Sequence, residues 1–239
     1  MMDPAFFTLH RGLPREAPGD DDSVHWALEL AGIAPDARLL DAGCGPGGDI
    51  AALLEHIPRG HLTAVDLHAP FIEEARARFP DEPRLNLRAA DMARPPGGPF
   101  DLIWCAGALY FLGVEAGLTA WREALAPGGW VAFTDAVWLT DHPSEEAREN
   151  WAEYLEMTDA GGVTAAVERA GYRVAGTRML PDAAWEAYYG PIDARIAELR
   201  AGNPDTALAI VLHEAEAEAA CWRAHRDEFG YMAVAAQRQ

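Results

Sequence analysis

The stretch LLDAGCGPGGDI, residues 39–50, has the residue types and spacing that point most clearly to chemistry. Gly43, Gly45 and Gly48 form the pattern GxGxxG between a predicted strand and a predicted helix. Because glycine lacks a Cβ atom, such a turn can bend sharply and let a nucleotide-like ligand approach the backbone. In dinucleotide-binding folds a turn of this kind holds a pyrophosphate at a helix N-terminus, and an adjacent carboxylate would repel it. Asp41 therefore favours a cationic ligand.

The same stretch resembles the first motif of the class I S-adenosylmethionine-dependent methyltransferases, which reads approximately acid, x, Gly, x, Gly, x, Gly. The resemblance covers residues 23–135 well and the rest of the chain in outline. S-adenosylmethionine carries an ammonium and a sulfonium group and no phosphate, so it is a cationic ligand of the kind that Asp41 favours. The resemblance implies S-adenosyl-L-methionine as cofactor, S-adenosyl-L-homocysteine as its product, and cofactor contacts at Asp41, Gly43, Cys44, Gly45 and Gly48.

Further acids follow at the ends of the next predicted strands. Asp66 ends the strand 61–66, where the family uses an acid to accept hydrogen bonds from both ribose hydroxyls, and the residue in the position of Leu67 packs on adenine. The alternative for Asp66 is a helix cap. Asp91 follows the third strand, where the family places an acid that accepts a hydrogen bond from the adenine amino group. The next backbone N–H, here that of Met92, donates to a ring nitrogen. An acceptor beside a donor matches the edge of adenine. The alternative for Asp91 is a solvated loop.

Two later segments also resemble family motifs. Residues 100–111, FDLIWCAGALYF, correspond to the fourth strand and its end, which lies beside the methionine part of the cofactor. The resemblance places Cys105 and Ala106 in contact there. Residues 125–131, LAPGGWV, match the LxPGG turn before the fifth strand, whose role is chiefly structural.

Methyl transfer is an in-line displacement at an activated carbon, so alignment of the acceptor supplies much of the catalysis and no nucleophilic residue is required. A hydroxyl or protonated amine acceptor also needs a general base within hydrogen-bond reach. The catalytic candidates at the carboxyl ends of the strands and in the N-terminal arm are Tyr110, His142 and His10. Their alternatives are a pocket-lining tyrosine for Tyr110 and a surface loop position for His142.

The late part of the chain contains an aromatic cluster at Trp185, Tyr188 and Tyr189, which is either core or an aromatic box over a flat or cationic acceptor. Glu214, Glu216 and Glu218 are predicted to form the solvated face of the long final helix. The His, Cys, Asp and Glu residues show no spacing typical of a metal site.

Short predicted strands alternate with helices from Arg38 to Asp135, which predicts parallel pairing through right-handed crossovers. We expect the α/β class, with a doubly wound, seven-stranded, mostly parallel sheet of the Rossmann-like methyltransferase type, its last strand antiparallel. Residues 1–22 are predicted to be an irregular arm, either a disordered tail or a flap over the site, and residues 23–239 the methyltransferase domain. A helical insertion, 181–228, separates the last two strands, and a helix capped by Ser144 is expected to run to about Thr158.

Composition limits the partners. The chain has 239 residues and a net charge of −19, which opposes nucleic-acid binding because that binding depends on Lys and Arg neutralising phosphates. Neither a signal sequence nor an apolar stretch long enough to span a membrane is present, and three widely spaced cysteines suggest no disulfide framework. We expect a cytoplasmic monomer or homodimer that acts on a small-molecule acceptor, similar to the type 11 group of the family. The alternatives are a cofactor-binding regulatory or interaction module without transferase activity, and an NAD(P)-dependent oxidoreductase.

Overall fold

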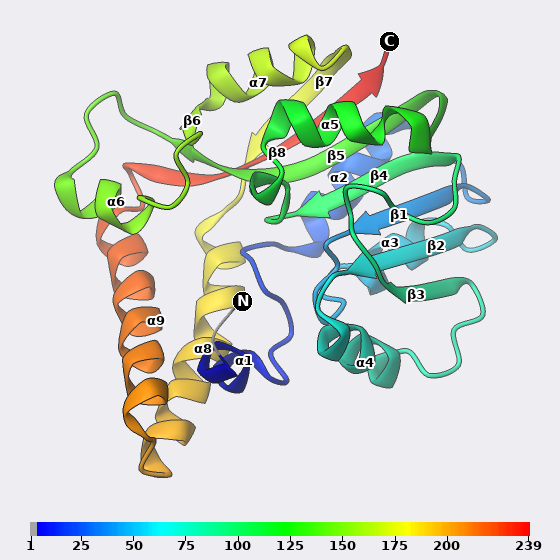
Figure 1. The fold of residues 1–239 in the computed structure, drawn as a ribbon. Helices are drawn as coiled ribbons and strands as arrows, with labels where there is room; N and C mark the ends of the chain where they lie inside the picture. Colours follow the sequence, from blue (N-terminus) through cyan, green and yellow to red (C-terminus); the bar gives the residue numbers. More distant parts are fainter. Residues whose placement is uncertain (1–3) are drawn as a thin grey trace.

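The computed structural model describes residues 4–239, which form an eight-stranded sheet flanked by helices (Figure 1). The strand order is β3-β2-β1-β4-β5-β8-β7, with β6 pairing with β5 off this path. The strands are β1 (Arg38–Ala42), β2 (His61–Asp66), β3 (Leu85–Ala89), β4 (Phe100–Ala106), β5 (Leu125–Trp138), β6 (Thr158–Asp159), β7 (Tyr172–Met179) and β8 (Phe229–Arg238).

Strands β1 to β5 pair in parallel, and β8 runs antiparallel to both β5 and β7. Their carboxyl ends therefore meet at one edge of the sheet, where open α/β sheets bind ligands. The predicted fold is confirmed, including the antiparallel last strand and the helices before it. The structure adds the two-residue strand β6, which is too short to give a pattern in the sequence.

The helices are α1 (Pro4–His10), α2 (Asp21–Ala31), α3 (Ile50–His56), α4 (Ala69–Arg78), α5 (Val114–Trp121), α6 (Glu145–Asn150), α7 (Ala160–Arg169), α8 (Asp182–Ala201) and α9 (Thr206–His225), with 3-10 turns η1 (Leu109–Phe111) and η2 (Arg122–Ala124). Successive strand residues face opposite sides of the sheet. Leu39 accordingly packs in the cluster that contains residues of α2, α3 and α4, and Leu40 in the cluster that contains residues of α5 and α7.

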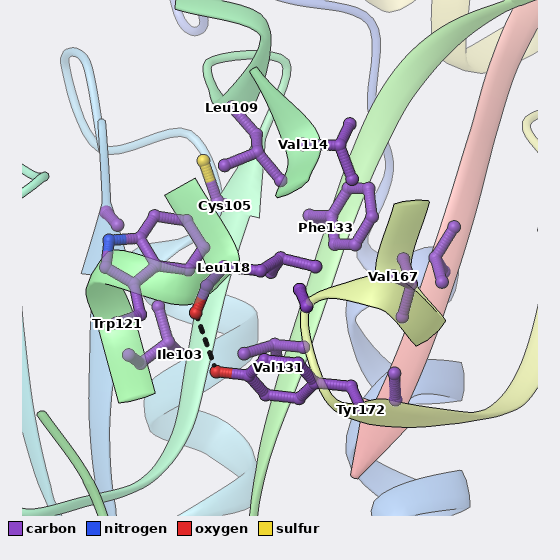
Figure 2. Packing of buried hydrophobic residues seen from close by; sticks show 14 of the residues in the cluster. Ile103, Cys105, Leu109, Val114, Leu118, Trp121, Val131, Phe133, Val167 and Tyr172 are labelled. Carbon is purple, nitrogen blue, oxygen red and sulfur yellow. Dashed lines mark hydrogen bonds between the residues drawn. The ribbon is translucent and has the colours of Figure 1, made fainter. Parts of the chain in front are cut away.

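Figure 2 shows the cluster under α5 and α7, where aliphatic and aromatic side chains of β4, β5 and β7 interdigitate. Tyr172, at the start of β7, is buried, and its hydroxyl donates a hydrogen bond of 2.9 Å to the carbonyl oxygen of Leu118. That carbonyl belongs to the last turn of α5, where helix carbonyls lack intrahelical partners. The hydrogen bond thus ties the end of α5 to the sheet.

Replacing Tyr172 with phenylalanine is expected to lower the free energy of unfolding by about 1–3 kcal/mol, because the Leu118 carbonyl would stay buried without its partner. Tyr188→Phe is the matched control, since the Tyr188 hydroxyl has no hydrogen-bond partner among residues 4–239. Urea unfolding of both variants measures the difference. Equal stability losses for the two substitutions would contradict this role of Tyr172.

A third cluster lies beyond the end of the sheet, where α8 and α9 extend as a helical pair with α1 beside them (Figure 1). Leu9 of α1, Trp185 and Tyr189 of α8, and Trp222 of α9 are buried in it together with Phe229 of β8. These helices connect β7 to β8, as the sequence predicted. Within residues 4–239, no helix is both long enough and apolar enough to cross a bilayer.

Two local predictions were wrong. The arm contains helix α1 and is not irregular throughout, because Leu9 and Ala5 can pack against α8 and α9, which a sequence pattern cannot show. Residues 1–3 of the predicted arm lie outside the described residues. The helix capped by Ser144 ends at Asn150, because Trp151 and Tyr154 turn toward the cluster of α8 and α9 and the chain then pairs with β5 at β6.

Candidate active site

The glycine-rich turn joins β1 to α3 at the carboxyl edge of the sheet. Gly43, Gly45 and Gly47 have φ values of 77°, 52° and 92°, in the region that favours glycine. The N–H groups of Gly43 and Cys44 both donate to the carbonyl oxygen of Val65, at 2.8 and 2.9 Å. The predicted turn is therefore present, and Gly47, which the sequence reasoning did not single out, shares its left-handed backbone conformation.

The turn brings the predicted segments of three strands together. A Cβ atom on Gly43 would lie 2.7 Å from the Cβ atom of Ala108 and 3.3 Å from the sulfur of Met92. Met92 also accepts a hydrogen bond at its carbonyl oxygen from the indole of Trp121, at 2.7 Å, which fixes the loop after β3. Gly43 thus allows the approach of the segments after β3 and β4.

Asp66 stands at the end of β2 and holds the turn. One carboxylate oxygen accepts the N–H of Gly45 at 2.9 Å, and the other accepts the N–H of His68 at 2.7 Å. A carboxylate offers about four lone-pair positions, so both oxygens can still accept from a ligand. The neighbouring Leu67 is 79% exposed, which leaves its side chain free to pack on a flat ring.

Asp41 is buried under the turn, with 2% of its surface exposed, and its Oδ2 atom has no hydrogen-bond partner among the described residues. Burial, followed by the nearby carboxylates of Asp49 and Asp66, raises the pKa of Asp41 well above its usual range. A buried, unpaired carboxyl group of this kind is stabilised by a cation or a hydrogen-bond donor. This observation fits a ligand with an ammonium or sulfonium group.

The remaining predicted cofactor contacts differ in exposure. Cys44 and Cys105 are buried, and desolvation and then the charge of Asp41 raise the pKa of both thiols. Ala106 is half-buried at the end of β4. Asp91 is exposed and accepts the N–H of Ala93 at 2.8 Å, so it closes a local turn while facing solvent.

The N-terminal arm lies across the glycine-rich turn. Arg15 places its Cβ atom 3.0 Å from the Cβ position of Gly48, and Glu16 places its Cγ atom 3.2 Å from that of Gly45. The Arg15 guanidinium contacts Asp49 at 3.2 Å, and both side chains are largely buried. Arg78 of α4 donates to the carbonyl oxygen of Pro14 at 2.9 Å. The arm therefore packs against the glycine-rich turn through Pro14, Arg15 and Glu16, and its role as a flap over the site stays a prediction.

The arm carries an acid–base pair into this region. His10 Nδ1 and Glu16 Oε2 lie 2.5 Å apart, and His10 is 4% exposed. The other Glu16 oxygen is buried without a partner among the described residues, and desolvation raises the pKa of Glu16. The sequence reasoning named His10 and missed Glu16, because nothing in the local pattern of the arm shows which strands it crosses.

Four tyrosines gather beside the arm, and we call them the tyrosine cluster: Tyr110, Tyr154, Tyr188 and Tyr231. The rings of Tyr110 and Tyr154 lie 5.5 Å apart, and the Tyr154 hydroxyl donates to Asp135 Oδ2 at 2.8 Å. Asp135 on β5 is 1% exposed, and desolvation raises its pKa to about 7. Asp135 is thus a second candidate base at this edge of the sheet.

Glu214, Glu216 and Glu218 are all exposed, as predicted, but Glu218 also acts on the tyrosine cluster. Its Oε1 atom accepts the Tyr189 hydroxyl at 3.0 Å, while Glu216 pairs with Arg200 on the outside. Glu218 remains accessible to solvent, yet its surroundings desolvate it enough to raise its pKa. The reason is that α9 packs against both α1 and α8, so more than one side of the helix meets protein.

The structure brings Tyr110 and His10 together in this region but leaves His142 in an exposed loop after β5. No interaction of the described residues joins the His142 side chain to the tyrosine cluster or to the arm. Trp185 and Tyr189 are core residues at 3% exposure each, and only Tyr188 of that aromatic group is half-buried. Away from the site, Glu146, Cys221 and His225 lie within 4.8 Å of one another, where His225 is paired with Glu146 and Glu228.

Comparison with known proteins agrees with this geometry. A family model described as a methyltransferase domain matches residues 40–131. Trans-aconitate 2-methyltransferase of Paracidovorax citrulli is 29% identical over 148 residues, which are 60% of this chain and 55% of the relative. The protein of the same name from Azoarcus sp. is 32% identical over 177 residues, which are 71% of this chain and 62% of the relative. The chain therefore spans less than two thirds of the length of either relative.

A solved structure extends the match to the whole chain. The S-adenosylmethionine-dependent methyltransferase from Geobacter sulfurreducens, crystallised in complex with S-adenosyl-L-homocysteine, has a TM-score of 0.85 and 18% sequence identity. The match covers 100% of this chain and 99% of that one, and at this identity it shows the shared fold. With the fold, the glycine-rich turn and the acidic strand ends in place, residues 40–131 match a methyltransferase domain, and the chain as a whole has the fold of an S-adenosylmethionine-dependent methyltransferase.

Proposed function

We propose that the protein transfers a methyl group from S-adenosyl-L-methionine to a small-molecule acceptor. The observation that carries this proposal is the buried carboxyl group of Asp41, whose Oδ2 has no partner among the described residues, beneath a glycine-rich turn that Asp66 holds in place. When bound, S-adenosylmethionine supplies a methyl group on a positively charged sulfur. The methyltransferase names of the relatives and neighbour support the same activity.

The residues proposed to hold the cofactor follow the strand ends. Asp66 would accept the ribose hydroxyls, Leu67 would pack on adenine, and the side chain of Asp91 with the N–H of Met92 would meet the edge of the base. The unpaired oxygen of Asp41 would stabilise the cationic end of the cofactor, and Cys105 and Ala106 would lie beside its methionine part. The arm residue Glu16, which contacts the turn at Gly45, would cover the bound cofactor from outside.

For the acceptor, Tyr110, His10 and Asp135 are the candidates in this region, and burial raises the pKa of Asp135 to about 7. A base with a pKa near the working pH is the most effective proton acceptor. We therefore assign proton removal to Asp135, with His10 as the alternative. His142 lies in an exposed loop and is given no role in this step. The three cysteines are free and buried, as is usual for proteins of a reducing compartment. We therefore include a cytoplasmic location in the proposal.

Two other functions remain distinguishable. A NAD(P)-dependent oxidoreductase would place a pyrophosphate against the turn, where Asp41, Asp49 and Asp66 would repel it. A binding module without transferase activity would hold the cofactor in the same way but would form no product.

The proposed activity is tested by incubating the protein with methyl-labelled S-adenosylmethionine and a panel of amines, phenols, thiols and carboxylic acids. We expect S-adenosylhomocysteine to form with at least one class faster than with the Asp66→Ala variant. A wild-type protein that binds S-adenosylmethionine but gives no product with any class would instead be a binding module.

A further inference from the structure

The acceptor side of the site contains three tyrosine hydroxyls without protein partners. Among residues 4–239, no group forms a hydrogen bond with the hydroxyls of Tyr110, Tyr188 or Tyr231. Burial, and then neighbouring carboxylates or tyrosines, raises the pKa of each, so all three stay protonated and neutral near pH 7. Their hydroxyls therefore have no competing partner among the described residues for a hydrogen bond with a ligand.

The tyrosine cluster lies directly beside the proposed methionine end of the cofactor. A Cβ atom on Gly107, the residue after Ala106, would lie 3.3 Å from Cε2 and 3.6 Å from the hydroxyl oxygen of Tyr231. In the ladder between β8 and β5, Ala136 pairs with Tyr231 and Asp135 with Met232, so the side chains of Tyr231 and Asp135 leave opposite faces of the sheet. Tyr231 therefore lies beside the end of β4, where the methionine part of the cofactor is proposed to lie, and Tyr154 connects Tyr110 to Asp135.

The charged groups around the tyrosine cluster are almost all acidic. Glu218 and Asp135 act on both Tyr110 and Tyr231, Glu153 also acts on Tyr110, and Glu218 and Glu16 act on Tyr188. The chain contains no lysine, and no arginine is among the charges that act on these three tyrosines. His10, which acts on Glu218, is the one basic side chain recorded near the cluster within the described residues.

This charge pattern opposes an acidic acceptor. Trans-aconitate, which the names of the two curated relatives contain, carries three carboxyl groups. Bringing a polyanion between Glu218 and Asp135 would place like charges together in a partly desolvated site, and no arginine or lysine of the cluster would compensate. The same site favours a cation, because aromatic faces and carboxylates both attract positive charge.

From this arrangement we propose that the acceptor is an organic amine that enters the site as an ammonium ion, between the faces of Tyr110, Tyr188 and Tyr231 and against the carboxylate of Glu218. The inference rests on the proposed function and names its substrate class. The Tyr189 hydroxyl, which donates to Glu218 at 3.0 Å, keeps one oxygen of this carboxylate in place and leaves the other for the ligand.

The chemistry balances without another reactant. The ammonium loses one proton to the Asp135 carboxylate or to water, and the lone pair left on nitrogen forms the new N–C bond with the methyl group. The C–S bond breaks as this bond forms, and its electron pair stays on sulfur as a neutral thioether. The positive charge moves from sulfur to nitrogen, and a secondary or tertiary amine product can then release its extra proton to solvent.

The test is a set of calorimetric titrations of the full-length protein saturated with S-adenosylhomocysteine. The probes are tetramethylammonium, choline and phenethylamine as organic ammonium ions, and trans-aconitate as the anion. Glu218→Gln removes the charge but keeps an oxygen that can accept from Tyr189. Glu214→Gln, an exposed position on the same helix, makes the same change in net charge and serves as the matched control.

We expect at least one ammonium probe to bind and trans-aconitate not to bind. Glu218→Gln should weaken the binding of that probe by about tenfold or more, while S-adenosylhomocysteine affinity and the Glu214→Gln variant stay unchanged. The proposal is overturned if no ammonium probe binds, if trans-aconitate binds more tightly than the probes, or if the two glutamine variants behave alike. Failure to bind S-adenosylhomocysteine at all would instead overturn the proposed function, so the two outcomes are distinguishable.

Discussion

Replacing Asp66 with alanine is expected to weaken the binding of S-adenosylhomocysteine by about 100-fold, or about 3 kcal/mol. The variant loses a carboxylate that would accept both ribose hydroxyls, and hydrogen bonds to charged groups are the stronger ones. It also frees the N–H of Gly45 and thereby loosens the turn on the cofactor side. Isothermal titration calorimetry measures the affinity, and circular dichroism shows whether the variant is folded.

The control is Asp101→Ala. Asp101 also accepts a backbone N–H, that of Arg38 at 2.8 Å, but at the opposite end of the strands. Loss of one structural hydrogen bond is therefore common to both variants, and only Asp66→Ala should lose affinity for the cofactor. Retained affinity in a folded Asp66→Ala protein would refute the ribose assignment.

Asp135→Asn is expected to change how stability depends on pH. The folded protein raises the pKa of Asp135 to about 7 from an ordinary value of 3.8, so the folded state holds a proton that the unfolded state releases. The contribution of this group to stability is therefore present at low pH and is lost as the pH rises toward 7. Between about pH 5 and about pH 8 the wild type should lose about 3 kcal/mol relative to Asp135→Asn, in which the group cannot ionise.

Urea unfolding of both proteins at the two pH values measures this difference. Asparagine retains the shape of the side chain and an oxygen that can accept the N–H of Ala136, so the variant should fold. Asp141→Asn, an exposed change in the loop that follows β5, provides the control and should follow the wild type. Parallel pH profiles for wild type and Asp135→Asn would mean that Asp135 does not hold its proton near neutrality.

The cofactor side of the site is readable from the sequence because its determinants are local. Gly43 and Gly45 need a backbone that only glycine adopts easily, and Asp41 and Asp66 end the strands on either side of the turn. These residues belong to short strand–turn–helix units, so their spacing along the sequence determines where they lie in the structure. The alternation of short strands and helices is local in the same way, whereas the antiparallel last strand was expected from the resemblance to the methyltransferase fold.

The acceptor side depends on contacts between distant segments, which sequence patterns do not show. Glu16 meets Gly45 across the arm, Tyr154 meets Asp135 from a loop, and Glu218 meets Tyr189 of the preceding helix. Glu218 in particular follows the pattern of an exposed helical glutamate, and only the packing of α9 against α1 and α8 separates it from Glu214.

The family match covers the cofactor side of the site but little of the acceptor side. The family match, residues 40–131, contains the glycine-rich turn and Asp66 but of the tyrosine cluster only Tyr110. The residues that would choose the acceptor lie in the arm, in the loop before β6 and in the two helices before β8. Relatives that share the cofactor half can therefore differ in acceptor, since a fold does not determine the chemistry of its substrate site.

The central claim is that the glycine-rich turn binds S-adenosylmethionine, and calorimetric titration with S-adenosylhomocysteine tests it most directly, with NAD⁺ and NADP⁺ titrated in parallel. We predict one binding site per chain for S-adenosylhomocysteine with a dissociation constant of about 1–100 μM, and no heat of binding for either dinucleotide. A folded protein that does not bind S-adenosylhomocysteine at high micromolar concentration, or that binds a dinucleotide in its place, would contradict the account.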